Sequence, residues 1–300
     1  MLFNFRSRVL TLLLASLAFA SNGFAWQGIE IVPPPPITGA GMEVLYTDRE
    51  PPQATVVEAP YVADEFEGRS MAVDVNLWHS DVAGDVDSMG MSLDLGDDTD
   101  IGSQNRVGIS GRWQFSELTQ LQLDYFQFNH SGYLNRAVTF DSLNYAAGSS
   151  VRVRNNLFGL GLAQTVSEYE TGGLRVLCGA RFSQLNTRLE QKFAAGTRVG
   201  ELDQNIGMPY LGLEGATRLS ANAGLTGSFK YFDLDRNGEP NRLSDFDFAF
   251  VFGRDYAAAP AQREWYGMLG YRHFMLNDAS DGSTSRIVYS GPVFGIRGRF

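Results

Sequence analysis

Residues 174–183 read LRVLCGARFS, and apolar side chains occupy every second position of this segment. Successive side chains of a β-strand point to opposite faces, so a period of two places one set of residues on each face. The segment therefore predicts a strand with one apolar face and one polar face that carries arginine. The apolar set is Leu174, Val176, Cys178, Ala180 and Phe182, and the other set includes Arg175, Arg181 and Ser183.

The same period recurs along most of the chain, and no helical period of comparable length interrupts it. Short connections alternate with long polar ones, which is the loop pattern of up-and-down membrane barrels. We therefore expect an all-β, antiparallel, up-and-down β-barrel of about ten strands, within a range of about eight to twelve. Twelve strands would require that 89–95 and 137–144 are additional strands. The ten expected strands are 70–79, 104–115, 117–129, 150–166, 172–187, 207–219, 221–234, 244–254, 262–276 and 285–300.

The N-terminal residues predict an exported protein. Arg6 and Arg8 precede the apolar run 9–20, and small-x-Ala cleavage sites end at Ala20 and Ala25. We assign residues 1–25 to a secretory signal on this pattern. Residues 26–68 are rich in proline, which disfavours strand pairing, so we expect a disordered periplasmic leader there. The barrel is expected to occupy residues 69–300.

A soluble barrel shows the same alternation, with its apolar set turned inward. Three observations favour a transmembrane barrel whose apolar set faces lipid. The chain has an export signal, it ends on a strand that closes with Phe300, and aromatic residues lie near the ends of expected strands, where interfacial girdles lie in membrane barrels. These aromatic residues are Trp78, Trp113, Phe115, Phe126, Phe128, Trp265, Tyr266 and Phe274.

The C-terminal strand Val293-Phe294-Gly295-Ile296-Arg297-Gly298-Arg299-Phe300 resembles the assembly signal of bacterial outer-membrane proteins, although Gly298 stands where that signal usually has an apolar side chain. Segments 91–98, 105–106, 121–125 and 172–182 look like uncharacterised outer-membrane β-barrel proteins of Gram-negative and planctomycete type. The resemblance implies export through the periplasm to the bacterial outer membrane. Its implied partners are outer-membrane lipid, lipopolysaccharide and the barrel-assembly machinery, and it implies no settled activity.

Composition excludes several classes of protein. The 24 basic and 34 acidic residues give a net charge of −10, which argues against nucleic acid as a partner. The only cysteine is Cys178, so the chain has no internal disulfide, and its apolar phase predicts that it faces lipid as an unreactive thiol. We expect a monomer.

The polar set of the strands is expected to line the lumen. A ten-stranded barrel has a narrow interior in which unpaired charges are costly, so arginine–carboxylate pairs are expected there. Two interpretations remain open: a lumen plugged by such pairs, and a narrow passive pore whose arginines admit small anions. The expected lumen arginines are Arg106, Arg112, Arg152, Arg154, Arg175, Arg181, Arg297 and Arg299, with Arg218 and Arg272 in the same phase, and the carboxylates are Asp74, Asp124, Glu214, Asp245 and Asp247.

Other chemistry has less support in the sequence. His130, with Ser131, Asp124 and Asp141 nearby, is the best candidate set for a hydrolase at the barrel rim, but no nucleophile motif surrounds Ser131. His79 and His273 also fall near the ends of expected strands. The sequence predicts no catalytic residue. The leading function is a structural barrel or a narrow passive pore for small solutes, and the alternatives are a surface-loop binding protein and a rim hydrolase.

The first long loop holds a cluster of carboxylates, which are the ligands that Ca²⁺ prefers. Their spacing does not fit an EF-hand, which needs glycine and glutamate at fixed positions. We therefore assign no metal and no cofactor. The cluster consists of Asp94, Asp97, Asp98 and Asp100.

Overall fold

The computed structural model describes residues 71–88, 91–116, 118–236, 239–254, 264–280 and 283–300. The expected signal (1–25) and leader (26–68) lie outside these residues. No helix in the described part of the chain is long and apolar enough to cross a membrane. The strands are β1 (Met71–Ser88), β2 (Met91–Asp94), β3 (Gln104–Gln114), β4 (Thr119–Tyr133), β5 (Val138–Phe140), β6 (Leu143–Tyr145), β7 (Ser150–Tyr169), β8 (Gly172–Phe193), β9 (Gly196–Ser220), β10 (Ala223–Arg236), β11 (Glu239–Phe252), β12 (Glu264–Ser280) and β13 (Ser283–Arg299).

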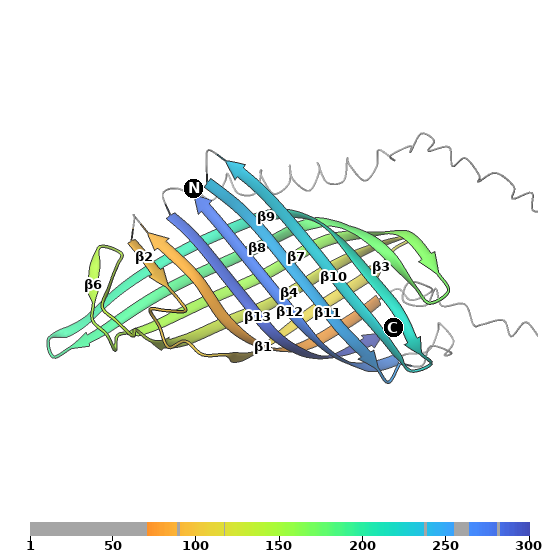
Figure 1. Cartoon of the computed structure of the whole chain (residues 1–300), viewed down its shortest axis with the longest axis horizontal. Helices are drawn as coiled ribbons and strands as arrows, with labels where there is room; N and C mark the ends of the chain where they lie inside the picture. Colours follow the sequence, from red (N-terminus) through yellow and green to blue (C-terminus); the bar gives the residue numbers. More distant parts are fainter. Residues whose placement is uncertain (1–70, 89–90, 117, 237–238, 255–263, 281–282) are drawn as a thin grey trace, which may run out of the picture. The chain divides into compact units, whose positions relative to one another are not determined.

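The strands form a closed antiparallel up-and-down barrel (Figure 1). Eleven strands share one sheet in the order β13-β12-β11-β10-β9-β8-β7-β4-β3-β1-β2, and β13 also pairs with β1. The pairing of β13 with β1 runs from Ala72↔Arg299 to Ser88↔Ser283 and closes the ring. Because β2 pairs only with β1, ten of the eleven strands form the ring. The prediction of an all-β barrel of ten strands is confirmed.

The two segments considered as additional strands, 89–95 and 137–144, contain short strands outside the ring. Segment 89–95 contains β2, which adds to the end of β1, and segment 137–144 contains most of the separate hairpin β5–β6. Neither adds a strand to the ring, so a twelve-stranded ring is wrong.

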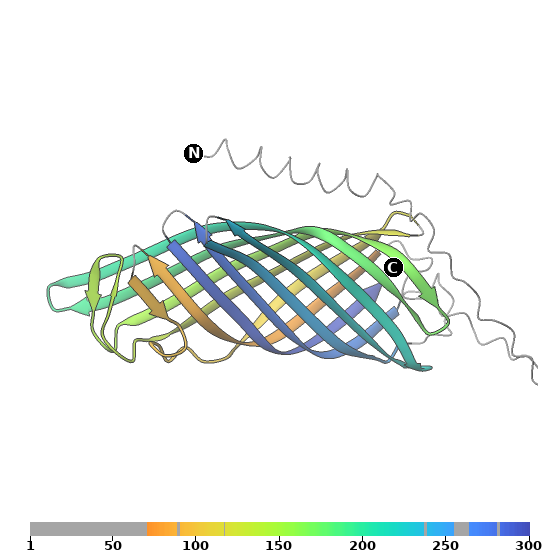
Figure 2. The same ribbon diagram turned by 45° about the horizontal axis from the view of Figure 1, so that its top comes forward.

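Several expected long loops are continuations of the strands. The expected loop between 188 and 206 is a hairpin in which β8 and β9 stay paired as far as Phe193↔Gly196. The β10–β11 hairpin likewise stays paired as far as Arg236↔Glu239. In Figures 1 and 2 the β8–β9 hairpin reaches farthest along the barrel, at the left. The strands therefore extend well beyond the length that a membrane requires.

A belt of exposed apolar side chains surrounds the barrel at the end where the short turns lie. On β8 the outward positions are apolar from 174 to 182, and a transmembrane strand needs about 9–11 residues. On the neighbouring β9, Leu211 is 68% exposed and Leu213 is 49% exposed. Soluble proteins rarely expose contiguous apolar patches of this extent. The belt is therefore the lipid-facing surface of a transmembrane β-barrel.

Beyond the belt the two faces of each strand exchange their chemistry. The outward positions of β8 become polar at Gln184 and Asn186, while the inward positions become apolar at Leu185 and Leu189, both of which are buried. This polarity is that of a barrel surrounded by water, which needs an oily interior. We call this part the extension; it comprises 78–88, 126–133, 150–157, 183–193, 196–208, 273–280 and 283–291.

The extension corrects the expected aromatic girdle. Trp78, Phe126, Phe128 and Phe274 are fully buried inside the barrel. Tyr266 is buried at the end of the barrel where the short turns lie, which we call the lower end. They share the inward phase of Asp74, Asp124 and Arg272, and above the belt this phase contains apolar residues because water surrounds the outside. Only the remaining three aromatic residues face outward, and all three lie near the short-turn end: Trp113, Phe115 and Trp265.

Candidate functional site: the closed lumen

At belt height the lumen is filled by paired charges, which we call the lumen network. The network comprises the cations Arg112, Arg175, Arg181, Lys230, Arg272 and Arg297 and the carboxylates Asp74, Asp124, Glu214, Asp245 and Asp247. Each lies in the inward phase of its strand, opposite to the apolar belt. Strands from all sides of the ring therefore contribute charges to one interior.

Asp245 on β11 is the most connected carboxylate of the network and is fully buried. Arg272 on β12 donates from Nε and Nη2 to its two oxygens at 2.9 and 2.8 Å. Arg181, on β8 across the lumen, donates from Nη2 to Asp245 at 2.5 Å and also pairs with Asp124 on β4. These charge-assisted bonds connect opposite walls and leave little room between them.

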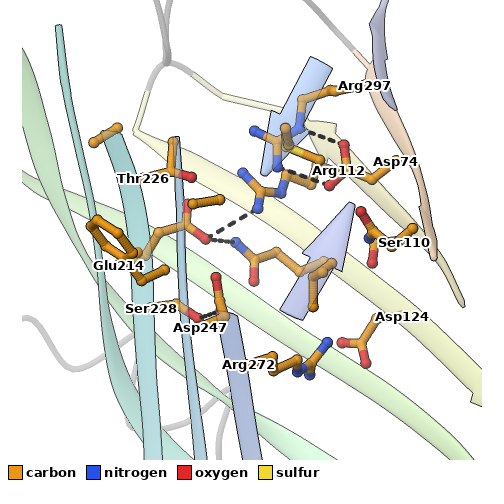
Figure 3. A pocket seen from close by; sticks show the side chains of 18 of the residues that line it. Asp74, Ser110, Arg112, Asp124, Glu214, Thr226, Ser228, Asp247, Arg272 and Arg297 are labelled. Carbon is orange, nitrogen blue, oxygen red and sulfur yellow. Dashed lines mark hydrogen bonds and ion pairs between the residues drawn. The ribbon is translucent and has the colours of Figure 1, made fainter. Parts of the chain in front are cut away.

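A second group of pairs surrounds Glu214 on β9 (Figure 3). Arg175 lies 3.3 Å and Arg112 3.7 Å from its carboxylate oxygens, and Gln122 donates to Oε2 at 3.1 Å. Arg297 on the last strand forms a two-pronged contact with Asp74 on the first strand, with Nη2 at 2.8 Å from Oδ2. The second contact joins the two strands that close the ring.

The space left within the network is a cavity of about 100 Å³. That is enough space for several water molecules. Asp247 and Lys230 both line it, and the Ser228 hydroxyl donates to Asp247.

Aromatic side chains of the extension close the lumen directly above the network. Phe128 stacks on Tyr289 with ring centroids 3.9 Å apart, and Trp78 meets Phe126 and Phe128 edge-on at 5.7 and 5.3 Å. The Arg272 guanidinium lies 4.4 Å from the centroid of Phe126, so the paired charges and the rings are in direct contact. We call Trp78, Phe126, Phe128, Phe274 and Tyr289 the aromatic layer.

Most of the residues expected in the lumen point inward. Arg106 is half-buried above the belt, where its guanidinium donates to the carbonyl oxygen of Asn129, and Arg299 is buried at the lower mouth. Lys230, which the sequence interpretation left out of the lumen set, is only 7% exposed. Its phase, shared with Thr226 and Ser228, was a signal that would have found it. The inward residues that the sequence singled out are Arg112, Arg175, Arg181, Arg297, Asp74, Asp124, Glu214, Asp245 and Asp247.

The assignment of Arg152 and Arg154 to the lumen is wrong. Both lie on the exposed outer face of β7, in phase with the lipid-facing Phe158. The inward side chains beside them are the fully buried Val151 and Val153. The physical reason is the change of surroundings, because charged side chains face water wherever the barrel leaves the lipid.

The structure does not bring together the four residues considered for a rim hydrolase. His130 is fully buried between the aromatic layer and Ser80, whose Oγ lies 3.5 Å from His130 Nε2. Burial, and then the nearby Arg106 guanidinium, lower the pKa of His130 to about 4. Ser131 points outward, as the next residue of a strand must, and Asp124 is paired with Arg181 below.

Asp141, the fourth of these residues, lies in the β5–β6 turn with a φ of 49°. The other two histidines are on the outer face, where His79 Nδ1 lies 2.8 Å from Asn105 Oδ1 and His273 is half-buried.

Three of the four carboxylates of the first long loop bind atoms of the protein. Asp94 Oδ1 accepts from the backbone amides of Gly96 and Asp97, at 2.7 and 2.9 Å. Asp98 is buried and pairs with Arg136, and Asp100 accepts from the backbone amide of Tyr133. These contacts fix the loop against the end of β4. No group of three or more metal-ligating side chains gathers in the part of the chain that the structure describes.

No protein-family model matches this sequence, and no curated protein matches it. Solved structures similar to it include the outer membrane protease OmpT from Escherichia coli, at 14% identity and a TM-score of 0.46 over 77% of this chain and 97% of that chain. Another is the translocator domain of the autotransporter NalP from Neisseria meningitidis, at 15% identity and a TM-score of 0.43 over 80% and 92%. The outer membrane protein OprG from Pseudomonas aeruginosa has 11% identity and a TM-score of 0.33 over 78% and 96%.

Proposed function

We propose that this protein is a bacterial outer-membrane barrel with a sealed lumen, which holds a rigid extension outside the cell. The observation that carries the proposal is the double closure of the interior. The lumen network fills the barrel at belt height, and the aromatic layer fills it immediately above. Of the two interpretations that the sequence left open, this favours the plugged structural barrel over the passive pore.

Electrical recording tests the sealed lumen. Purified protein inserted into planar bilayers is expected to give no stepwise conductance, because paired charges and packed aromatic rings occupy the lumen at two successive heights. Liposomes that contain the protein should also retain small sugars and amino acids. Reproducible conductance steps whose anion preference falls in Arg112→Gln would refute the proposal and restore the pore.

The orientation follows from the belt and the short turns. Membrane barrels of this type have short periplasmic turns and longer extracellular segments, so the extension is proposed to lie outside the cell. The single cysteine makes this testable. In a Cys178→Ser background, Ser131→Cys on the outer face of the extension should react with a membrane-impermeant maleimide on intact cells. Glu170→Cys, in the β7–β8 turn, should react only after lysis, and the opposite pattern would invert the orientation.

A second proposal concerns the outer-leaflet glycolipid. Arg152 and Arg154 are exposed on β7, and they have no hydrogen-bond or ion-pair partner among the described residues. Arg154 lies four residues above Phe158, or roughly 10 Å for a strand tilted by about 40°. Long arginine side chains bend toward a membrane surface. We propose that these two guanidiniums bind phosphate groups of lipopolysaccharide, because the planar guanidinium can donate two parallel hydrogen bonds to one phosphate.

Lipid binding can be measured without a functional assay. The double variant Arg152→Gln/Arg154→Gln is expected to retain several-fold less lipopolysaccharide after purification than the unchanged protein. Lys192→Gln, which removes a cation from the far end of the β8–β9 hairpin, is the control and should retain the normal amount. Equal retention by the two variants would exclude the phosphate contact.

A further inference from the structure

We propose that the lumen cavity holds one small monovalent anion, bound by the ammonium group of Lys230. Lys230 is 7% exposed, and its side chain lines the cavity. It has no hydrogen bond or ion pair within 4 Å in the described part of the chain, and its Nζ lies 5.6 Å from the centroid of the Tyr210 ring. Burying an ammonium without an acceptor is costly, so an acceptor is expected in the adjoining space.

The carboxylates near Lys230 are already engaged. Asp245, its register partner on β11, accepts three bonds from Arg181 and Arg272. Asp247 accepts the hydroxyl of Ser228. The nearest charges above and beside Lys230 therefore include two arginines, which repel it, and carboxylates that have other donors.

The lumen network has one more positive than negative charge. It contains six cations and five carboxylates, so one positive charge is uncompensated. At the lower mouth, the buried Arg254 and Arg299 outnumber the half-buried Glu264, so these residues do not supply the missing negative charge. One monovalent anion in the cavity balances the network. A buried charge without compensation would destabilise the folded barrel.

The cavity also sets the size and chemistry of the ligand. The cavity of about 100 Å³ has room for a halide or nitrate together with water. Arg112 and the hydroxyl-bearing Ser110 and Thr226 line the same space and supply further donors. Figure 3 shows these side chains around the space beside Glu214. The site is therefore built for a compact acceptor with a single charge.

Bromide can take the place of a bound chloride, and anomalous diffraction locates it in a crystal. Full-length protein refolded and crystallised in sodium bromide is expected to show an anomalous peak in the cavity, within hydrogen-bond distance of Lys230 Nζ. Lys230→Met keeps the length of the side chain and removes the charge, so its crystals should lack the peak. Lys192→Met changes the chain's other lysine, at the exposed hairpin end, and should keep it. A wild-type map with only water in the cavity would overturn the proposal, whether or not the variant folds.

A solution measurement provides the second test. At constant ionic strength, the unfolding midpoint of the detergent-solubilised protein should be several degrees higher when it is folded in chloride than in gluconate, a much bulkier anion. Lys230→Met should lose this difference and Lys192→Met should retain it. An equal chloride effect in both variants would show an adventitious ion only. The outcome is independent of the conductance test, since a sealed barrel without a bound anion would still be electrically silent.

Discussion

The substitution Asp245→Asn removes one charge from the centre of the lumen network and keeps the shape of the side chain. The carboxylate is fully buried and accepts three bonds, from Arg181 at 2.5 Å and from Arg272 at 2.9 and 2.8 Å. An amide offers one oxygen, and its NH₂ group faces guanidinium donors. Breaking a buried ion pair on one side costs about 3–5 kcal/mol. We expect the free energy of unfolding to fall by about 3 kcal/mol, the lower end of this range, because Arg181 keeps its second partner Asp124.

The loss is measurable by urea unfolding of the barrel in lipid vesicles, followed by tryptophan fluorescence. Trp78 is a local reporter, because the Arg272 guanidinium lies 5.2 Å from its ring. Asp233→Asn is the matched control: it makes the same chemical change in a pair with Arg242 at the barrel surface, where solvent screens the charges and the effect should be much smaller. If the two variants unfold at the same urea concentration, the lumen network does not stabilise the barrel as argued.

Three further predictions follow from the belt and the extension. The pKa of His130 is about 4 in the folded state and near 6.5 in the unfolded state, so between these pH values only the unfolded state gains the proton. Lowering the pH from about 6.5 to 4 should therefore reduce the free energy of unfolding of the wild type by up to about 3 kcal/mol. In urea titrations, His130→Phe should remove this contribution to the pH dependence. Leu213→Lys, in the belt of β9, should cost about 2–4 kcal/mol in vesicles, whereas Asn205→Lys above the belt should cost less than about 1 kcal/mol, and equal costs would misplace the belt. Phe128→Ala should cost about 3–5 kcal/mol in the same assay, and a negligible loss would show that the aromatic layer is not a packed core.

Much of the architecture could be read from alternation. The period of two in segments such as 174–183 and 221–234 predicts strands, and the spacing of turns predicts ten of them. The face of the strand on which each residue lies could also be predicted. On β4, one face carries Leu121, Leu123 and Tyr125, and the other carries Asp124, Phe126 and Phe128. The phase does not shift along β4, so the same count that places Asp124 inside places both phenylalanines inside.

The candidate site could be predicted from the sequence to the same extent. The strands that carry Asp245, Arg181 and Glu214 predict inward charges, but sequence does not pair residues on opposite walls of a barrel. Arg181 and Asp245 are 64 positions apart, and they meet because the ring closes. The long β8–β9 hairpin was missed because its outward residues are polar, a composition typical of loops.

The sequence by itself determined that this chain forms alternating strands, that a narrow barrel results, and which residues of each strand share a face. Only the tertiary structure decided what surrounds each face at each height. An alternating strand satisfies lipid with its apolar set outward and water with its apolar set inward, so the pattern is the same in both solvents. The closed ring fixes how far each strand continues past the belt, and therefore where Arg154 faces water and Phe128 joins a core.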